Sequence, residues 1–246
     1  MRTDLQRRAI ALIYGFACHG LFLIAVGLMA FGLYTGMACG IGRLEGVSAV
    51  LVNGLLLIQF PILHSILLTR RGMKLLGRLA PSDLGRSLSP TTYALFAAIQ
   101  IGTTFFLWSP SSITLWRPDG LAETLHIGCF VLAWAFLGKA LLDAGLGLQT
   151  GWIGWTSAWS DRSPRYPNLP VRGLFRRSRQ PIYLGFALVM WTGPVWTLDH
   201  LAIAIVWGSY CVIGPLLKER RFAVNYGNDF EVYRQEVPYF IPKLFS

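Results

Sequence analysis

Long apolar runs most constrain what this chain can fold into. A helix needs about 20 predominantly apolar residues to cross the hydrocarbon core of a bilayer. The runs lie at residues 9–34, 47–69, 89–108, 121–147, 182–197 and 200–217. The last two are shorter and are separated by only two residues, which favours a tight helical hairpin. The sequence therefore predicts an all-α, polytopic membrane bundle with about six transmembrane helices.

The composition agrees with a membrane protein. Hydrophobic residues make up 54% of the 246 residues and charged residues only 14%, which is too apolar for an ordinary soluble domain of this length. The formal net charge of +10 is compatible with a nucleic-acid partner when taken alone. However, the cations lie in the connections between apolar runs, where cytoplasmic loops and anionic lipid headgroups account for them. We therefore expect a lipid bilayer as the partner and no nucleic acid.

The same cations predict the orientation. Only Arg43, Arg117 and Lys139 of the 22 Lys and Arg residues lie outside four connections that share one side of the membrane. Those connections hold the others, from Arg2 near one end to Lys243 near the other. Because cytoplasmic loops are enriched in Lys and Arg, both termini are predicted to be cytoplasmic.

The chain contains neither an internal repeat nor a low-complexity tract, so we predict a single membrane domain over residues 1–246. Within it, residues 1–147 form a four-helix N-terminal part. Residues 148–246 comprise an interfacial segment, the helical hairpin and a cytoplasmic tail. The interfacial assignment rests on the tryptophans of residues 148–180, because Trp is enriched at membrane–water interfaces.

The tail is expected to be folded. Its large apolar and aromatic residues recur at helical spacing and fall on one stripe: Phe222, Tyr226, Phe230, Tyr233 and Val237. Pro238 then ends the helix.

Several polar residues have simple structural interpretations. Lys139 and Asp143 are four residues apart and are expected to pair on one helix face. Asp199 and His200 fall in the outer turn of the hairpin, where we expect contact with solvent. The four cysteines show no CxxC spacing and are interpreted as packing residues, so no metal site is predicted.

A block of polar and aromatic residues surrounds the last hairpin. Arg179-Gln180-Pro181-Ile182-Tyr183-Leu184-Gly185 precedes it. Lys218-Glu219-Arg220-Arg221-Phe222-Ala223-Val224-Asn225-Tyr226-Gly227 follows it, and Tyr233 and Val237-Pro238 come after. This pattern brings a cation-rich helix start, an acid and two tyrosines to the cytoplasmic mouth of the hairpin, where a polar cofactor could bind above an apolar substrate.

This block resembles the membrane methyltransferases of the isoprenylcysteine carboxyl methyltransferase type. Their signature is an Arg-His-Pro-x-Tyr-x-Gly turn, a short hairpin, a Glu-Glu pair, an aromatic-Gly, a Tyr and a Val-Pro. In the N-terminal half, Tyr14-Gly15, the stretch from Val52-Asn53 to His64-Ser65 and the following Arg71-Gly-Met-Lys resemble the bacterial methanethiol S-methyltransferases. The resemblance covers most of the chain and is most specific in the last third.

The resemblance implies an enzyme of a bacterial inner membrane that binds S-adenosylmethionine and methylates a small or lipophilic acceptor, with a thiol favoured. By position, one wall of the cofactor site would be formed by Arg179, Gln180, Pro181, Tyr183 and Gly185. Glu219 would hold the amino-acid or ribose end of the cofactor, and Tyr226 and Tyr233 would close over it. Asn53 and His64 are candidates for the acceptor side. No catalytic residue is assigned, because a sulfonium is already activated and alignment supplies much of the rate.

Two residues depart from the family pattern. Gln180 stands where the family has His, and Lys218 stands where it has the first Glu. Gln still donates and accepts hydrogen bonds but does not titrate, whereas Lys reverses a charge beside a cationic ligand.

These departures keep two alternatives open. One is a haem-associated or non-catalytic membrane subunit on the same scaffold, since relatives such as the zeta-carotene isomerase branch are haem-associated. His19, His64 and His126 lie in or near apolar runs and are the candidate ligands of haem b. However, His64 is predicted near the inner face and His126 near the outer face, which argues against their forming one axial pair. The other alternative is a structural subunit of a larger membrane complex.

Overall fold

The computed structural model describes residues 3–81 and 83–242, so Arg2 and Lys243 of the cation pattern lie outside the described residues. Helices account for most of this part of the chain, which confirms the all-α prediction. The long helices are α1 (Asp4–Tyr34), α2 (Gly46–Leu67), α4 (Gly85–Leu107), α5 (Gly120–Ala144) and α9 (Leu198–Tyr226). The shorter ones are α3 (Arg70–Leu79), α6 (Leu146–Gln149), α7 (Trp152–Trp159), α8 (Pro181–Trp191), α10 (Asn228–Glu236) and the 3-10 turn η1 (Gly173–Arg176).

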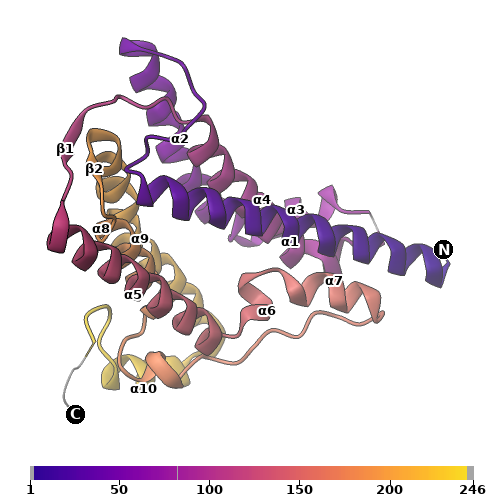
Figure 1. Ribbon diagram of the computed structural model, residues 1–246. Helices are drawn as coiled ribbons and strands as arrows, with labels where there is room; N and C mark the ends of the chain where they lie inside the picture. Colours follow the sequence, from indigo (N-terminus) through magenta and orange to yellow (C-terminus); the bar gives the residue numbers. More distant parts are fainter. Residues whose placement is uncertain (1–2, 82, 243–246) are drawn as a thin grey trace. The chain divides into compact units, whose positions relative to one another are not determined.

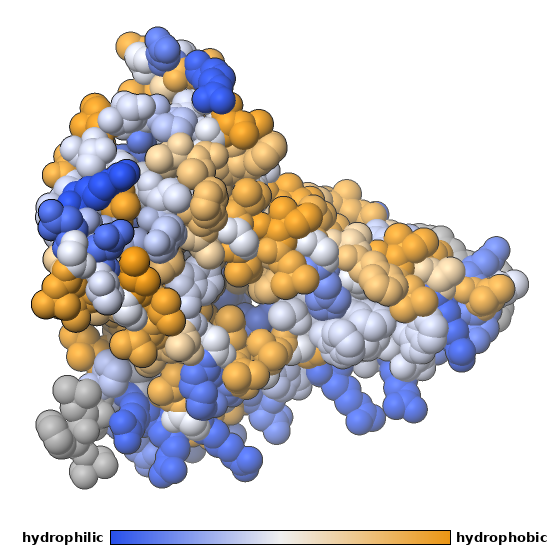
Figure 2. Space-filling model, in the orientation of Figure 1, coloured by the Kyte–Doolittle hydropathy of each residue, from blue (hydrophilic) through white to orange (hydrophobic). Residues whose placement is uncertain are grey.

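Four helices are long and apolar enough to cross a membrane: α1, α2, α5 and α9. Their outward side chains are apolar, as Figure 2 shows in orange over much of the visible surface, and Phe16, Val47 and Leu121 are each at least 75% exposed. Such exposure is unfavourable in water but is expected in lipid. The chain is a multi-pass membrane protein.

The remaining two predicted spans differ from the others. α4 has 23 residues but carries buried polar side chains, including Gln100 and Thr104. α8 has only 11 residues, about 16 Å at 1.5 Å per residue, and is too short to cross the hydrocarbon core on its own. The count of six spans and the cytoplasmic side of both termini therefore stay predictions.

The chain forms two compact units. The first comprises residues 1–30, 52–108 and 145–167, and the second comprises residues 31–51, 109–144 and 168–246. Each unit is described by itself. The predicted single domain with a division after residue 147 stays a prediction.

In the first unit, α4 is the central element and packs against α3 and α7 (Figure 1). A buried cluster joins small and branched side chains from α1, α4, α7 and the connection between α3 and α4: Ala11, Ala80, Leu84, Leu88 and Ala158. Trp155 and Trp159 of α7 cover this cluster. The tryptophan segment therefore includes a helix, α7, that packs on the bundle, and its place at the interface stays a prediction.

The second unit is built around α8, which packs against α5 on one side and α9 on the other (Figure 1). Gly185 allows the α5 contact, because a Cβ at this position would lie 2.9 Å from the Cα of Leu137. α9 begins at Leu198 and continues to Tyr226, so the helix runs nine residues past the end of the predicted run at residue 217.

The expectation that Asp199 and His200 face solvent is wrong. Asp199 is 7% exposed, and its carboxylate accepts hydrogen bonds from the backbone N–H and the hydroxyl of Ser111 at 2.8 and 2.7 Å. His200 is fully buried, with Nε2 2.8 Å from the carbonyl oxygen of Met190. β2 (Trp196–Thr197), just before these two residues, pairs with β1 (Thr114–Trp116) in a two-stranded antiparallel sheet. This pairing covers the turn.

Gly85→Ala should lower the free energy of unfolding by about 1–3 kcal/mol, because a Cβ there would lie 2.0 Å from the carbonyl oxygen of Gly77 in the neighbouring helix. Denaturant titration of the purified protein in detergent measures the change. The matched control is Gly20→Ala in α1, where no atom lies within 4 Å of the added Cβ and the change should be neutral or slightly stabilising. Equal effects of the two substitutions would contradict the packing described.

Candidate functional site

Arg179 is the centre of a polar network in the second unit. It lies in the turn between η1 and α8, and its Nε donates to Glu219 Oε1 of α9 at 2.8 Å. Its Nη1 donates to the carbonyl oxygens of Arg234 and Val237, both at 2.7 Å. The guanidinium therefore joins three segments: the turn before α8, the end of α9 and the tail.

The Arg179–Glu219 pair is well shielded, with side-chain exposures of only 10% and 12%. Glu219 Oε2 also lies 3.3 Å from Arg179 Nη2, which makes the contact two-pronged. Two-pronged, charge-assisted hydrogen bonds are among the strongest polar contacts in proteins and define geometry as well as energy. The carboxylate predicted to hold the cofactor is thus already engaged in positioning Arg179.

The two departures from the family pattern contact each other. Lys218 Nζ donates to Gln180 Oε1 at 3.0 Å, and Gln180 Nε2 donates to Glu219 Oε1 at 2.8 Å. Lysine only donates and the carboxylate only accepts, so the two neighbours fix which end of the Gln180 amide faces each of them. Gln180 is 1% exposed and therefore meets both of its polar neighbours without water. Lys218 carries a positive charge where the family has a negative one, and the amide oxygen of Gln180 accepts a hydrogen bond from it.

Aromatic rings surround the Lys218 ammonium. Nζ lies 5.1 Å from the ring centroid of Phe222, 5.7 Å from that of Phe175 and 5.8 Å from that of Tyr183. Faces of aromatic rings attract cations at these distances. The cage and the Gln180 hydrogen bond together explain how a lysine is accommodated beside Arg179.

The tail is held on this network by its backbone. The N–H of Arg179 donates to the carbonyl of Pro238 at 3.0 Å, and the hydroxyl of Ser178 donates to the carbonyl of Phe240 at 2.8 Å. The predicted stripe packs as expected, because Phe230, Tyr233 and Val237 form a buried cluster that Phe222 and Tyr226 extend.

Tyr233 has a defined position in that cluster. It is 7% exposed, and its hydroxyl donates to the carbonyl of Phe175 at 2.7 Å. Burial raises the pKa of Tyr233 well above its usual value, so the phenol stays neutral at physiological pH.

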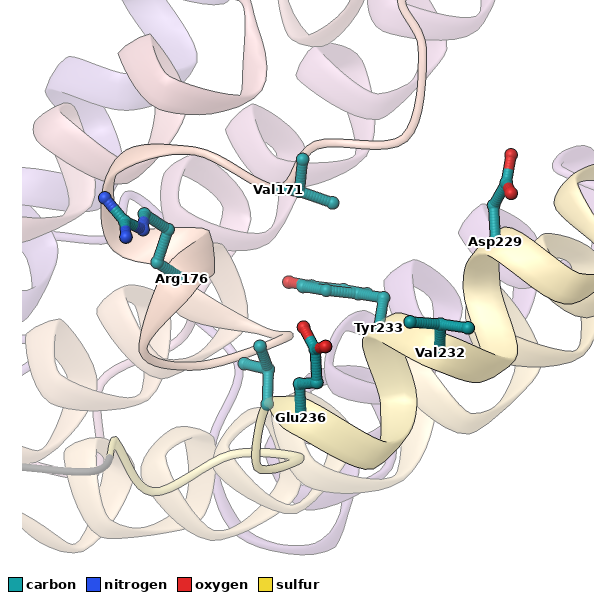
Figure 3. A pocket seen from close by; sticks show the side chains of 7 residues that line it. Val171, Arg176, Asp229, Val232, Tyr233 and Glu236 are labelled. Atoms are coloured by element: carbon teal, nitrogen blue, oxygen red, sulfur yellow. The ribbon is translucent and has the colours of Figure 1, made fainter. Parts of the chain in front are cut away.

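Two neighbouring hollows open beside α10. The first has a volume of about 420 Å³ (Figure 3). Its lining residues are Val171, Arg176, Asp229, Val232, Tyr233, Glu236 and Val237. The second, about 460 Å³, is lined by Tyr226, Asn168 and Leu169 and shares Val171 and Asp229 with the first. Figure 3 shows Tyr233, Val232 and the carboxylates of Asp229 and Glu236 extending from α10, with Val171 on the opposite segment. The hollows combine apolar walls, two phenols, two acids and the guanidinium of Arg176.

The structure brings most of the predicted C-terminal residues together. Arg179, Gln180 and Glu219 form the network, Tyr183 flanks Lys218, and Tyr226 and Tyr233 line the hollows. The other two predicted residues have structural roles. Pro181 occupies the first turn of α8, where its missing N–H costs nothing, and Gly185 permits the close approach of α5.

The acceptor-side candidates belong to the first unit and are described there alone. His64 lies in α2, and its ring nitrogens lie 2.7 and 2.9 Å from the hydroxyl of Tyr93 in α4. Asn53 is buried in the same helix. The roles of both residues, like those of the C-terminal residues, stay predictions.

The candidate haem ligands have protein partners. His19 Nε2 accepts a hydrogen bond from Trp155 Nε1 at 3.0 Å, and His126 Nδ1 lies 2.8 Å from the carbonyl oxygen of Ala122. Together with the His64–Tyr93 contact, these interactions give each of the three histidines a partner within the protein. Within residues 3–81 and 83–242, no group of three or more His, Cys, Asp or Glu side chains has an arrangement suited to a metal ion.

Sequence reasoning missed several residues of the site. Ser178 donates to the carbonyl of Phe240 in the tail, and the Phe175 ring faces the Lys218 ammonium. Nothing in the local sequence of Ser178 or Phe175 indicates these contacts. Asp229 and Glu236 line the first hollow, and their positions on the tail helix could have indicated it. A spacing of seven residues puts both on the same face, two helical turns apart.

Three curated proteins are similar to the chain over most of its length, and all are named methanethiol S-methyltransferase. The protein from a Pseudomonas species is 29% identical over 237 residues, which cover 94% of this chain and 90% of the relative. The second enzyme of that name from Bradyrhizobium diazoefficiens is 30% identical over 203 residues, covering 80% and 75%. The Mycobacterium tuberculosis protein is 27% identical over 256 residues, covering 96% and 98%.

Other comparisons give no match. No family model matches the chain. No solved structure matches it either.

Lys218 and Gln180 should be energetically coupled. In a double-mutant cycle with Lys218→Met and Gln180→Met, the double variant should lose less stability than the sum of the single variants by about 0.5–3 kcal/mol, because each single change removes the same hydrogen bond. Denaturant titration in detergent supplies the four free energies. Additive losses would show that the two side chains do not interact.

Tyr239 should make stability fall at alkaline pH. Burial, together with the negative charge of Glu219 and against the opposing charge of Arg179, raises the pKa of Tyr239 to about 12, and its hydroxyl donates to the carbonyl of Val212 at 2.6 Å. A raised pKa in the folded state contributes stability that is complete below the unfolded value of about 10 and is lost as pH rises through about 12.

The measurement compares the unfolding free energy of the wild type with that of Tyr239→Phe at pH 8 and at pH 12. The advantage of the wild type should shrink at the higher pH. An unchanged difference between the two proteins would contradict the contribution of Tyr239.

Proposed function

Because the chain belongs to the methanethiol S-methyltransferase family, we propose that it is a membrane enzyme that transfers a methyl group from S-adenosylmethionine to a small thiol. The observation that carries the proposal is the pair of hollows beside α10, lined by Tyr226 and Tyr233 and by the carboxylates of Asp229 and Glu236. The names of the relatives support methanethiol as the acceptor.

The residues present fit this methyl donor in three respects. Small-molecule sites typically measure about 300–1,000 Å³, and each hollow falls in that range. The donor carries a sulfonium, an ammonium and a carboxylate, so Asp229 and Glu236 complement its cationic groups and Arg176 complements its carboxylate. Val171, Val232 and Val237, together with the tyrosine rings, offer apolar and aromatic surface to an adenine.

The chain's own groups position and shield the reaction. When bound, S-adenosylmethionine supplies a methyl group already activated by its positive sulfur. Arg179 and Glu219 hold α9, the turn before α8 and the tail together, so the walls of the hollows keep their places. Alignment of this kind lowers the barrier by removing motions that the reactants otherwise have to lose.

The acceptor needs little help from a side chain. A thiol ionises far more readily than an alcohol, and its thiolate attacks the methyl carbon directly. The new sulfur–carbon bond forms while the bond to the sulfonium sulfur breaks, and the thiol proton leaves to solvent. This chemistry is consistent with a neutral Tyr233 and with the absence of a titratable group at Gln180.

The location follows from the charge pattern. The network and hollows lie in cation-rich segments that the loop distribution assigns to the cytoplasm, where S-adenosylmethionine is made. Because the matched relatives are bacterial, we assign the protein to a bacterial inner membrane. A haem-bearing or non-catalytic subunit is not favoured, since the relatives are named as methyltransferases.

The proposal predicts saturable binding of S-adenosylhomocysteine to the detergent-purified protein, measured by calorimetric titration. Asp229→Asn with Glu236→Gln should weaken binding roughly tenfold or more, since a lost contact to a charged group costs about 1.5–3 kcal/mol. Addition of methanethiol and S-adenosylmethionine should produce dimethyl sulfide, detected in the headspace by gas chromatography.

Glu231→Gln is the matched control. Glu231 also lies on α10 but lines neither hollow and pairs with Arg234 at 2.9 Å, so binding should be unchanged. A folded protein that neither binds S-adenosylhomocysteine nor forms dimethyl sulfide would overturn the proposed function.

A further inference from the structure

Helix α3 carries a basic stripe with a hydrophobic edge. Its sequence, Arg70–Leu79, contains no acidic residue. With 3.6 residues per turn, four exposed cations fall along one stripe: Arg70, Arg71, Lys74 and Arg78. None of these four side chains has an ion-pair partner among the described residues.

Two leucines border this stripe. Leu75 and Leu79 are 51% and 54% exposed, whereas Leu76 is fully buried against the rest of the unit. The helix therefore presents, in order around its circumference, a buried face, an exposed leucine edge and a cationic stripe. A helix that lies at a membrane surface has this arrangement, with its apolar edge entering the acyl boundary and its cations at headgroup level.

The position of α3 is fixed by tight backbone contacts. The helix begins three residues after the end of α2, a helix long and apolar enough to cross the membrane. Thr69 caps it by accepting a hydrogen bond from the N–H of Gly72 at 3.1 Å. A Cβ at Gly72 would lie 2.3 Å from the carbonyl oxygen of Ile66, so the chain turns sharply between α2 and α3.

The opposite end of the helix is equally confined. The contact between Gly77 and Gly85 leaves no room for a side chain at residue 85. Neither end can swing away without breaking this packing, so the cations are held at one level beside the end of the span. Anionic headgroups carry the opposite charge and lie at the level of the cations on a helix at the membrane surface.

We propose that α3 is a binding surface for anionic phospholipid headgroups. The cations attract the phosphates, and Leu75 and Leu79 enter the acyl region beside them. This proposal concerns the first unit alone and does not rest on the proposed methyl transfer, so either can fail without the other.

The test follows the thermal unfolding of the full chain in a neutral, non-ionic detergent. The protein is titrated with dioleoyl phosphatidylglycerol, with dioleoyl phosphatidylcholine and with inorganic phosphate. Phosphatidylglycerol should raise the melting temperature with a saturable midpoint, whereas equal concentrations of the other two should not. The midpoint should move to higher lipid concentration as salt is added, because exposed charges are screened.

Lys74→Gln with Arg78→Gln should raise the phosphatidylglycerol midpoint on the order of 30-fold, since each basic side chain near an anionic surface contributes about fivefold. The matched control is Arg162→Gln with Arg165→Gln, which neutralises two exposed cations of the same unit outside α3 and should leave the midpoint within about threefold, less than one α3 cation contributes. The charge-preserving pair Lys74→Arg with Arg78→Lys should bind like the wild type. Far-UV circular dichroism confirms that each variant is folded.

Three outcomes would overturn the proposal. The first is an equal response to phosphatidylcholine, which would show a general lipid effect. The second is an equal response to inorganic phosphate, which would show binding of a free anion. The third is an equal loss in the two neutralised pairs, which would show that net charge and not α3 determines the affinity.

Discussion

The guanidinium of Arg179 is the contact on which the C-terminal third depends. It engages the carboxylate of Glu219 and the carbonyls of Arg234 and Val237, all within a shielded environment. A buried cation without partners would be very costly, so Arg179 needs all three acceptors close to it. The same guanidinium therefore holds the two segments that supply them, the end of α9 and the tail. The hollows beside α10 exist because the turn before α8, the end of α9 and the tail converge on that group.

Much of this arrangement could be predicted from the sequence. Apolar run length identified the four long membrane helices, because the thickness of the hydrocarbon core fixes the number of residues needed to cross it. Helical spacing identified the tail stripe, and Phe230, Tyr233 and Val237 are buried as it requires. The family motif correctly grouped Arg179, Gln180 and Glu219, although their contacts lie about 40 residues apart in the chain.

Other features depend on tertiary contacts that local patterns do not encode. Asp199 and His200 were expected in solvent, yet both are buried, where Ser111 donates to Asp199 and the Met190 carbonyl contacts Nε2 of His200. The length of α8 was overestimated because apolarity continues past Trp191, where the helix ends, and Pro194 disfavours its continuation. In the sequence, Lys218 places an unfavourable positive charge beside a site for a cationic ligand. In the structure, its ammonium contacts Gln180 and three aromatic rings, which the local sequence does not indicate.

The tail is attached to the network almost entirely through main-chain carbonyls, those of Arg234, Val237, Pro238 and Phe240. Every amino acid supplies a carbonyl oxygen, so these four hydrogen bonds do not depend on side-chain identity, although Val237 also packs in the buried cluster. Homologous tails can therefore diverge in sequence at Arg234, Pro238 and Phe240 while closing on the same arginine and serine. Shortening the chain is a different matter, because it removes the acceptors themselves. Over residues 234–240, the hydrogen bonds to Arg179 and Ser178 accordingly constrain the path of the main chain and not the identity of the residues that supply the carbonyls.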